Sequence, residues 1–177
     1  MADVSVRPAR PEDAEPIARV QLMTWKSAYG ELLPTEALDL PLVQVAAVWL
    51  NAIESRPSPR HRVLVALEQR ELVGFAASEP TSDDDLDPGQ TVELSALLVE
   101  PRWGRRGHAS RLLAASVEFW RGDAATLAVT WAFEADTVMT AFLESAGWGF
   151  DGLGRGLDTG PRLVHQRRLH TDLQPLA

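Results

Sequence analysis

The chain has 177 residues, a formal net charge of −8 and no cysteine, and its composition, 45% hydrophobic and 24% charged, is that of an ordinary globular protein. The acidic balance argues against general binding to nucleic acid or to anionic membranes, and the missing cysteines exclude disulfides and thiolate metal sites. The length fits one domain, residues 1–177. Since no apolar run approaches the ~20 residues of a membrane span and the N-terminus lacks a signal-peptide pattern, we expect a cytoplasmic protein.

The first half of the chain predicts one strand, a set of helices and a hairpin. Residues 4–7 alternate apolar and polar side chains before Pro8, which is typical of an edge strand. Apolar residues at helical spacing predict a helix over residues 11–29, and a further helical stretch over 35–53 that Pro41 can divide in two. Residues 62–67 and 71–77 are predicted to pair as a β-hairpin.

An acidic loop follows over residues 81–90. Its aspartates could chelate a hard cation, but they lack the glycine and glutamate positions of a calcium-binding loop. We therefore expect a solvated loop and no metal site. The aspartates concerned are Asp83, Asp84, Asp85 and Asp87.

The second half alternates strands with helices. Strands are predicted over residues 93–99, 126–131 and 163–169, with one helix that ends at Gly122 and another that Asp136 caps. A strand before and after each late helix favours a partly parallel sheet, whereas the hairpin requires an antiparallel portion. The expected fold class is α/β, with a mixed, partly antiparallel, twisted sheet flanked by about four helices.

The loop that opens the first of these late helices is suited to hold an anion. The first amides of a helix have no intrahelical partner, and they lie at the positive end of the helix dipole. Gly107 lets an anion approach closely, and Arg105 and Arg106 add positive charge to an acidic chain. An ordinary solvated turn with two surface arginines is the alternative, because the loop matches neither common phosphate-binding glycine motif.

Four segments together resemble the GNAT-type N-acetyltransferases. The opening VRPARPEDA of residues 6–14 is similar to the family's IRPARPEDA start, and LVGF of residues 72–75 is similar to its vvGf strand. Residues 99–113 resemble the acyl-CoA segment V-x-P-x-x-[RQ]-x-x-G-x-[GA]-x-x-L-L, and residues 136–148 resemble the N…A…FYEKLGF helix. The order and spacing of the four segments make the resemblance specific over nearly the whole chain.

The resemblance implies a GNAT fold and acetyl-CoA as cosubstrate, with no metal. It places the cosubstrate's pyrophosphate on the amides of Arg105, Arg106, Gly107, His108 and Ala109, with Asp136 nearby, and its pantetheine arm along Leu97, Leu98 and Val99. The His108 side chain is expected to contact phosphate or solvent. In the family an amine attacks the thioester directly, without a covalent intermediate.

Glu93 is the candidate base for this reaction. Similar sequences often carry ELYALYV where this chain has ELSALLV, and a primary amine with a pKa of about 10.4 must lose a proton before it attacks. Ser95 shares the strand face of Glu93 and could assist it. The alternative for Glu93 is an ordinary surface glutamate near the end of a strand.

Two residues depart from the family pattern. Gly104 stands where the family usually has Arg or Gln, and Leu143 stands where it commonly has the tyrosine that protonates the CoA thiolate. A leucine cannot donate a proton. The chain is thus expected to be an N-acetyltransferase, and a catalytically weak or inactive acyl-CoA-binding module that acts as a sensor or interaction partner is the alternative.

The acceptor is expected to be a primary amine of a small molecule or a protein. Trp25 and Tyr29 are candidates for lining its site, although both also fit core packing at helical spacing. The family implies no nucleic-acid or membrane partner, and it leaves a homodimer open.

Overall fold

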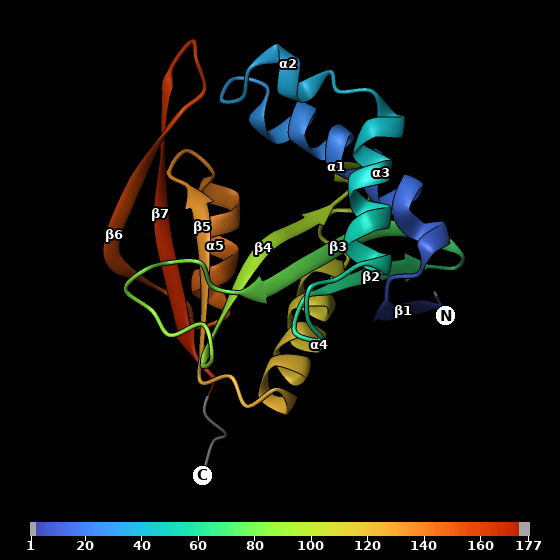
Figure 1. Cartoon of the computed structure of the whole chain (residues 1–177). Helices are drawn as coiled ribbons and strands as arrows, with labels where there is room; N and C mark the ends of the chain where they lie inside the picture. The colour runs from blue at the N-terminus through green and yellow to red at the C-terminus, as the bar shows by residue number, and fades with distance from the viewer. Residues whose placement is uncertain (1–2, 174–177) are drawn as a thin grey trace.

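In the computed structural model, which describes residues 3–173, one seven-stranded sheet forms the centre of the chain, with the strand order β1-β2-β3-β4-β5-β7-β6 (Figure 1). The strands are β1 (Val4–Pro8), β2 (Arg62–Glu68), β3 (Glu71–Pro80), β4 (Thr91–Val99), β5 (Leu127–Phe133), β6 (Gly149–Asp158) and β7 (Leu163–Asp172). The helices are α1 (Ala14–Tyr29), α2 (Thr35–Leu38), α3 (Leu42–Glu54), α4 (His108–Gly122) and α5 (Thr137–Ser145). The expected mixed α/β class is confirmed.

Most of the expected elements form close to their predicted bounds. The stretch over residues 35–53 splits at Pro41 into α2 and α3, which is why five helices flank the sheet rather than about four. The first helix begins with a short 3₁₀ turn, Pro11–Asp13, before α1. The edge strand β1 and the hairpin of β2 and β3 are antiparallel neighbours, as expected.

One strand was not predicted. β6 contains four glycines and shows no alternation of apolar and polar residues, so its sequence carries no strand signal. It forms because β7 supplies an antiparallel partner, with an irregular register between Phe150 and Gly154. The presence of β6 makes β7 antiparallel to β5, so that only β4 and β5 pair in parallel. The expected partly parallel sheet is confirmed in that one pair alone.

Two apolar layers hold the sheet. On one face, α1 and α3 pack on β2, β3 and β4, and Ile17, Val65 and Phe75 there are fully buried. On the other face, α4 and α5 enclose the larger core. Trp120 on α4 is fully buried in it, and its indole nitrogen donates to Ser78 Oγ at 3.0 Å, which satisfies its polar group.

The first layer covers only part of its face. Helices α1 and α3 lie over β2 to β4, whereas β5, β7 and β6 stand to one side of them (Figure 1). The loop of residues 81–90 crosses that half of the sheet (Figure 1). None of the helices within residues 3–173 is long and apolar enough to cross a membrane.

Candidate active site

The site begins where two central strands part. β4 and β5 pair only from Thr91 to Glu93, and beyond that point the strands diverge (Figure 1). A bulge in the pairing of β4 with β3 leaves Ser95 without an opposite residue. Because β5 no longer pairs with the later part of β4, the backbone from Leu97 to Val99 has one open edge. Cavities lie on both sides of this opening.

The first cavity, called here the loop cavity, has a volume of about 850 Å³. It is bounded by the open end of β4, by the loop that leads into α4 and by the first turns of α5. The predicted cofactor residues among its lining are Leu97, Leu98, Val99, Arg105, Gly107, His108, Ala109 and Asp136. Of the predicted set, only Arg106 does not line it.

The loop before α4 has the backbone shape of an anion-binding turn. Arg105 and Gly107 both adopt left-handed φ angles, 60° and 80°. Within α4 the amide of Arg111 donates to the carbonyl of Gly107 at 3.0 Å, so the amides before it belong to the unpaired first turn of the helix. Left-handed residues next to a helix start turn successive N–H groups toward one point, a concavity that favours anions.

The arginines in and before this loop differ in whether they form ion pairs. Arg106 donates to Glu68 Oε1 at 3.0 Å and stacks over the Trp103 ring. Arg102 pairs with Glu71 and Glu100. Among residues 3–173, no ion pair involves Arg105, which lines the loop cavity.

His108 differs from its expected placement. Its side chain is buried, and its Nε2 lies 2.7 Å from Glu68 Oε2, so the imidazole faces the end of β2 and not solvent. The expected contact of this side chain with phosphate or solvent is replaced by the contact with Glu68, because the first turn of α4 directs the side chain into the protein. Burial alone would raise the pKa of Glu68, but the hydrogen bonds from His108 and Arg106 lower it. These two hydrogen bonds fasten the loop to the β2–β3 hairpin.

The second cavity, called here the aromatic cavity, has a volume of about 510 Å³ and lies between α1, α3 and the parted strands. Six of the twelve aromatic residues of the chain line it. They are Trp25, Tyr29, Trp49, Phe75, Trp131 and Phe133. Two edge-to-face pairs join them, Tyr29 with Phe133 at 4.8 Å and Trp49 with Phe75 at 5.0 Å between ring centroids.

The two cavities share one boundary. Tyr29 and Asp136 line both, and the Tyr29 hydroxyl donates to Asp136 Oδ2 at 2.7 Å. The other oxygen of Asp136 accepts from the Met139 amide at 2.9 Å, which makes Asp136 the N-cap of α5 as predicted. Burial and the bond to Asp136 raise the pKa of Tyr29, so its hydroxyl keeps its proton. A molecule in either cavity would meet this pair.

The two candidate catalytic residues on β4 have different surroundings. Ser95 lines the aromatic cavity, and its hydroxyl donates to the Ala77 carbonyl at 3.2 Å. Glu93, two residues earlier, lines neither cavity. Burial raises the pKa of Glu93, the negative charge of Asp83 raises it further, and Arg155 opposes the shift. A carboxylate with a raised pKa is a better proton acceptor at neutral pH.

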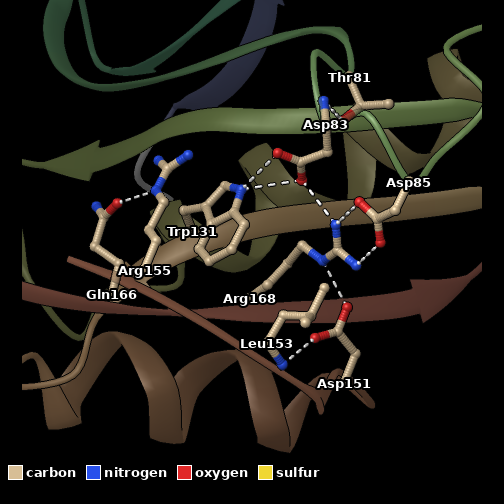
Figure 2. Close-up of polar contacts among 9 residues, drawn as sticks. All are labelled: Thr81, Asp83, Asp85, Trp131, Asp151, Leu153, Arg155, Gln166 and Arg168. Carbon is tan, nitrogen blue, oxygen red and sulfur yellow. Dashed lines mark hydrogen bonds and ion pairs between the residues drawn. The ribbon is translucent and has the colours of Figure 1, made fainter. Parts of the chain in front are cut away.

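A buried cluster of charges fixes the loop beside Glu93 (Figure 2). The Arg168 side chain on β7 is 4% exposed, and its guanidinium donates to Asp83 at 3.0 Å, to Asp85 at 2.6 Å and to Asp151 at 2.6 Å. The Trp131 indole donates to Asp83 as well, at 3.1 Å. The loop of residues 81–90 is thereby fastened to β6 and β7, and Asp83 also holds Trp131, which lines the aromatic cavity.

This cluster corrects the expectation of a solvated loop for two of its aspartates, whereas Asp84 and Asp87 are exposed as expected. Asp83 is largely buried and Asp85 is paired, because Arg168 on a distant strand binds both. Within residues 3–173 no group of three or more histidine, cysteine, aspartate or glutamate side chains is arranged to hold a metal ion.

Comparison with known proteins gives the family. A sequence model of the acetyltransferase (GNAT) family matches residues 22–148, well over half of the chain. The chain belongs to the GNAT acetyltransferase family. The resemblance that the four segments indicate is thus confirmed, and family membership supports acetyl transfer as the general activity.

The relatives of this GNAT protein include sequences and solved structures. It is 31% identical over 121 residues to an uncharacterised N-acetyltransferase of Bacillus subtilis, YuaI, a match that spans 66% of the chain and 64% of that relative. The PaiA N-acetyltransferase of Thermoplasma acidophilum, solved with coenzyme A, superposes with a TM-score of 0.75 at 17% identity over 96% of the chain and 99% of PaiA. YncA of Salmonella typhimurium, solved with acetyl-CoA, superposes with a TM-score of 0.75 at 17% identity over 99% of the chain and 96% of YncA.

The side chain of Leu143, the residue that the resemblance aligns with the family's usual tyrosine, lies in the core of this GNAT chain. It is 1% exposed and packs within the apolar layer under α5, and it lines neither cavity. Gly104, the other departure, lines the loop cavity.

Several site residues were not singled out from the sequence. Trp49 lies on the apolar face of a helix, Trp131 and Phe133 lie at the end of a strand, and Phe75 belongs to the LVGF segment, which indicates a strand but no contact with a substrate. The number of tryptophans, six in a chain that is 7% aromatic, was the available signal. Arg168 gave no local signal, because its partners lie 17 to 85 residues away in sequence.

The first prediction concerns the stability of the Arg168 cluster. Arg168→Met removes the shared partner of Asp83 and Asp151, which stay poorly hydrated, so we expect a loss of about 3–5 kcal/mol in the free energy of unfolding. Arg19→Met is the control, because its exposed helical pair with Glu15 is worth only about 0.3–0.5 kcal/mol. Urea unfolding measures both variants. Equal effects would mean that the Arg168 cluster does not stabilise the fold.

Proposed function

We propose that the protein transfers an acetyl group from acetyl-CoA to a primary amine of a small molecule or a protein, by direct attack of the amine on the thioester. The observation that carries the proposal is the meeting of two cavities at Tyr29 and Asp136, where β4 leaves β5. One cavity begins at the N-terminus of α4 and the other is closed by helices α1 and α3. Such an arrangement can hold two reactants in contact, which lowers the barrier of a two-substrate reaction.

The loop cavity is proposed as the acetyl-CoA site. The pyrophosphate would bind the amides from Arg105 to Ala109, and the free Arg105 guanidinium would add the positive charge that Gly104 does not supply. The pantetheine arm would bond to the open backbone edge from Leu97 to Val99. PaiA and YncA, which share the fold, were solved with coenzyme A and acetyl-CoA, and this supports the assignment.

The aromatic cavity is proposed as the acceptor site. In the reaction, the ammonium first loses one proton, and the free amine nitrogen then forms a bond to the acetyl carbon. The carbon–sulfur bond breaks, CoA leaves as its thiolate, and the nitrogen loses its second proton to solvent. The first proton passes to Glu93 through water, because Glu93 does not line the cavity. Its raised pKa favours this role. Ser95, two residues further along β4, lines the cavity, where its hydroxyl can position that water.

The alternative function is an acyl-CoA-binding module with weak or no catalysis. The observation that favours it is Leu143, a buried leucine at the position of the usual acid, which cannot protonate the leaving thiolate. Tyr29 does not replace that acid readily, since its hydroxyl is bonded to Asp136 and its pKa is raised.

A titration with acetyl-CoA, paired with a screen for thiol release over primary amines, tests the function. We expect binding together with release for at least one amine, because both cavities are formed. Binding without release for any amine would support the binding module. An absence of acetyl-CoA binding would contradict both functions.

The role of Glu93 is tested by Glu93→Gln, which keeps the shape and removes the base. We expect the rate at pH 7 to fall by a factor on the order of 10²–10⁴. Wild-type kcat/KM should fall as the pH drops through the raised pKa of Glu93, because the protonated carboxyl accepts no proton. The variant should lose this limb and gain rate toward pH ~10, where the amine is free. Glu79→Gln, which changes the residue opposite Glu93 on β3, is the control and should keep the rate at pH 8. An unchanged profile in Glu93→Gln would show that another group takes the proton.

The anion turn is tested by Gly107→Val. Gly107 has a φ of 80°, where a β-branched residue is strained by about 1–2 kcal/mol, so the turn should shift and acetyl-CoA affinity should fall roughly tenfold. Gly122→Ala on the same helix is the control, since an added Cβ meets nothing within 4 Å and φ is not positive there. Calorimetric titration measures both affinities. Equal affinities in the two variants would place the pyrophosphate elsewhere.

A further inference from the structure

We propose that the acceptor is an arylalkylamine without a carboxylate: a primary amine on a short chain that carries a flat aromatic group. The inference rests on the proposed function, because it names the substrate of the aromatic cavity. It goes beyond family membership, since it depends chiefly on Trp25, Trp49 and Trp131, which lie outside the four family segments.

The walls of the aromatic cavity favour a flat apolar group. Aromatic rings from α1, α3, β3 and β5 line it, and their edge-to-face pairs leave ring faces and edges for a further ring. Its volume of about 510 Å³ lies in the range of small-molecule sites, about 300–1,000 Å³. A ring that enters would replace water against apolar surface on several sides.

The charges of the lining select against an acid. Among the residues that line the cavity within 3–173 there is no lysine, arginine or histidine, and the one carboxylate is Asp136. Arg155 does not line the cavity: its guanidinium stacks on the Trp131 ring at 4.2 Å, and its Nε donates to Gln166 at 2.7 Å. A substrate carboxylate would therefore lose its hydration without gaining a cation. Free amino acids are poor substrates on this ground.

The same lining favours a single positive charge. An ammonium is attracted by aromatic faces, and Asp136 lies at the boundary with the loop cavity, where the reacting amine must be. The second ammonium of a diamine would find no second carboxylate in the lining, whose other polar side chains are neutral. One amine near Asp136 and one ring among the aromatic side chains match the distribution of polarity in the cavity.

The test uses matched amines and two readouts. 2-Phenylethylamine and L-phenylalanine share ring and amine and differ in the carboxylate, while n-butylamine lacks the ring and 1,4-diaminobutane has a second charge. Calorimetry in the presence of CoA measures amine binding without chemistry, and thiol release from acetyl-CoA measures turnover. We expect 2-phenylethylamine to bind and react at least tenfold better than each of the others.

Variants locate the effect in the cavity. Trp49→Leu should weaken binding of 2-phenylethylamine at least fivefold with little change for n-butylamine, and Trp49→Phe, which keeps a ring, should restore part of the loss. Phe119→Leu is the control, because this ring lies on α4 and lines neither cavity. Urea unfolding verifies that each variant is folded.

The outcomes separate the inference from the function. Preferred binding of 2-phenylethylamine without turnover would support the arylalkylamine site and count against catalysis. Turnover that prefers L-phenylalanine, n-butylamine or 1,4-diaminobutane would leave the acetyltransferase in place and overturn the inference. A failure of 2-phenylethylamine to bind, or equal affinities in wild type and Trp49→Leu, would also overturn it.

Discussion

The parting of β4 and β5 after Glu93 is the constraint on which the site depends. Two parallel strands that stay paired leave no room between them, and here the pairing stops after three residues. Two hydrogen bonds hold the elements around the opening. Thr130 Oγ1 on β5 donates to the Leu94 carbonyl on β4 at 2.7 Å, and the Tyr29 hydroxyl on α1 donates to Asp136 at the start of α5. The opened backbone edge of β4 and both cavities follow from this one interruption of the sheet.

Local signals were enough to predict the part of the site that depends on one segment. Pro101, Gly107 and the apolar spacing of Leu112 and Leu113 define a strand, a turn and a helix whose backbone geometry is set within about twenty residues. The cap at Asp136 is equally local, since its partner is the Met139 amide three residues on. Glycine and capping signals report such backbone conformations directly, because only a few residue types tolerate or satisfy them.

The rest of the site depends on which segments meet, and a single sequence does not encode that locally. β6 is held by β7 rather than by its own propensity. Arg168 looks like an exposed strand residue until the loop of residues 81–90 covers it. The aromatic cavity exists because α1 and α3 cover β2 to β4 and leave Trp131 and Phe133 beside them. An apolar strand face has the same pattern whether a helix or a substrate covers it.

Under the proposed function, the absence of an acid at Leu143 weighs less against catalysis than the loss of the base would. A thiol has a pKa near 8.5, so a thiolate is stable enough in water at neutral pH to leave without receiving a proton at the same moment. An ammonium with a pKa near 10.4 must lose a proton first, because only the unprotonated nitrogen has the electron pair that attacks the thioester. The groups that matter most are therefore those that receive the amine's proton and hold the amine in place. The raised pKa of Glu93 and the Tyr29–Asp136 pair at the cavity boundary suit those two tasks, so the replacement at Leu143 is compatible with an active enzyme.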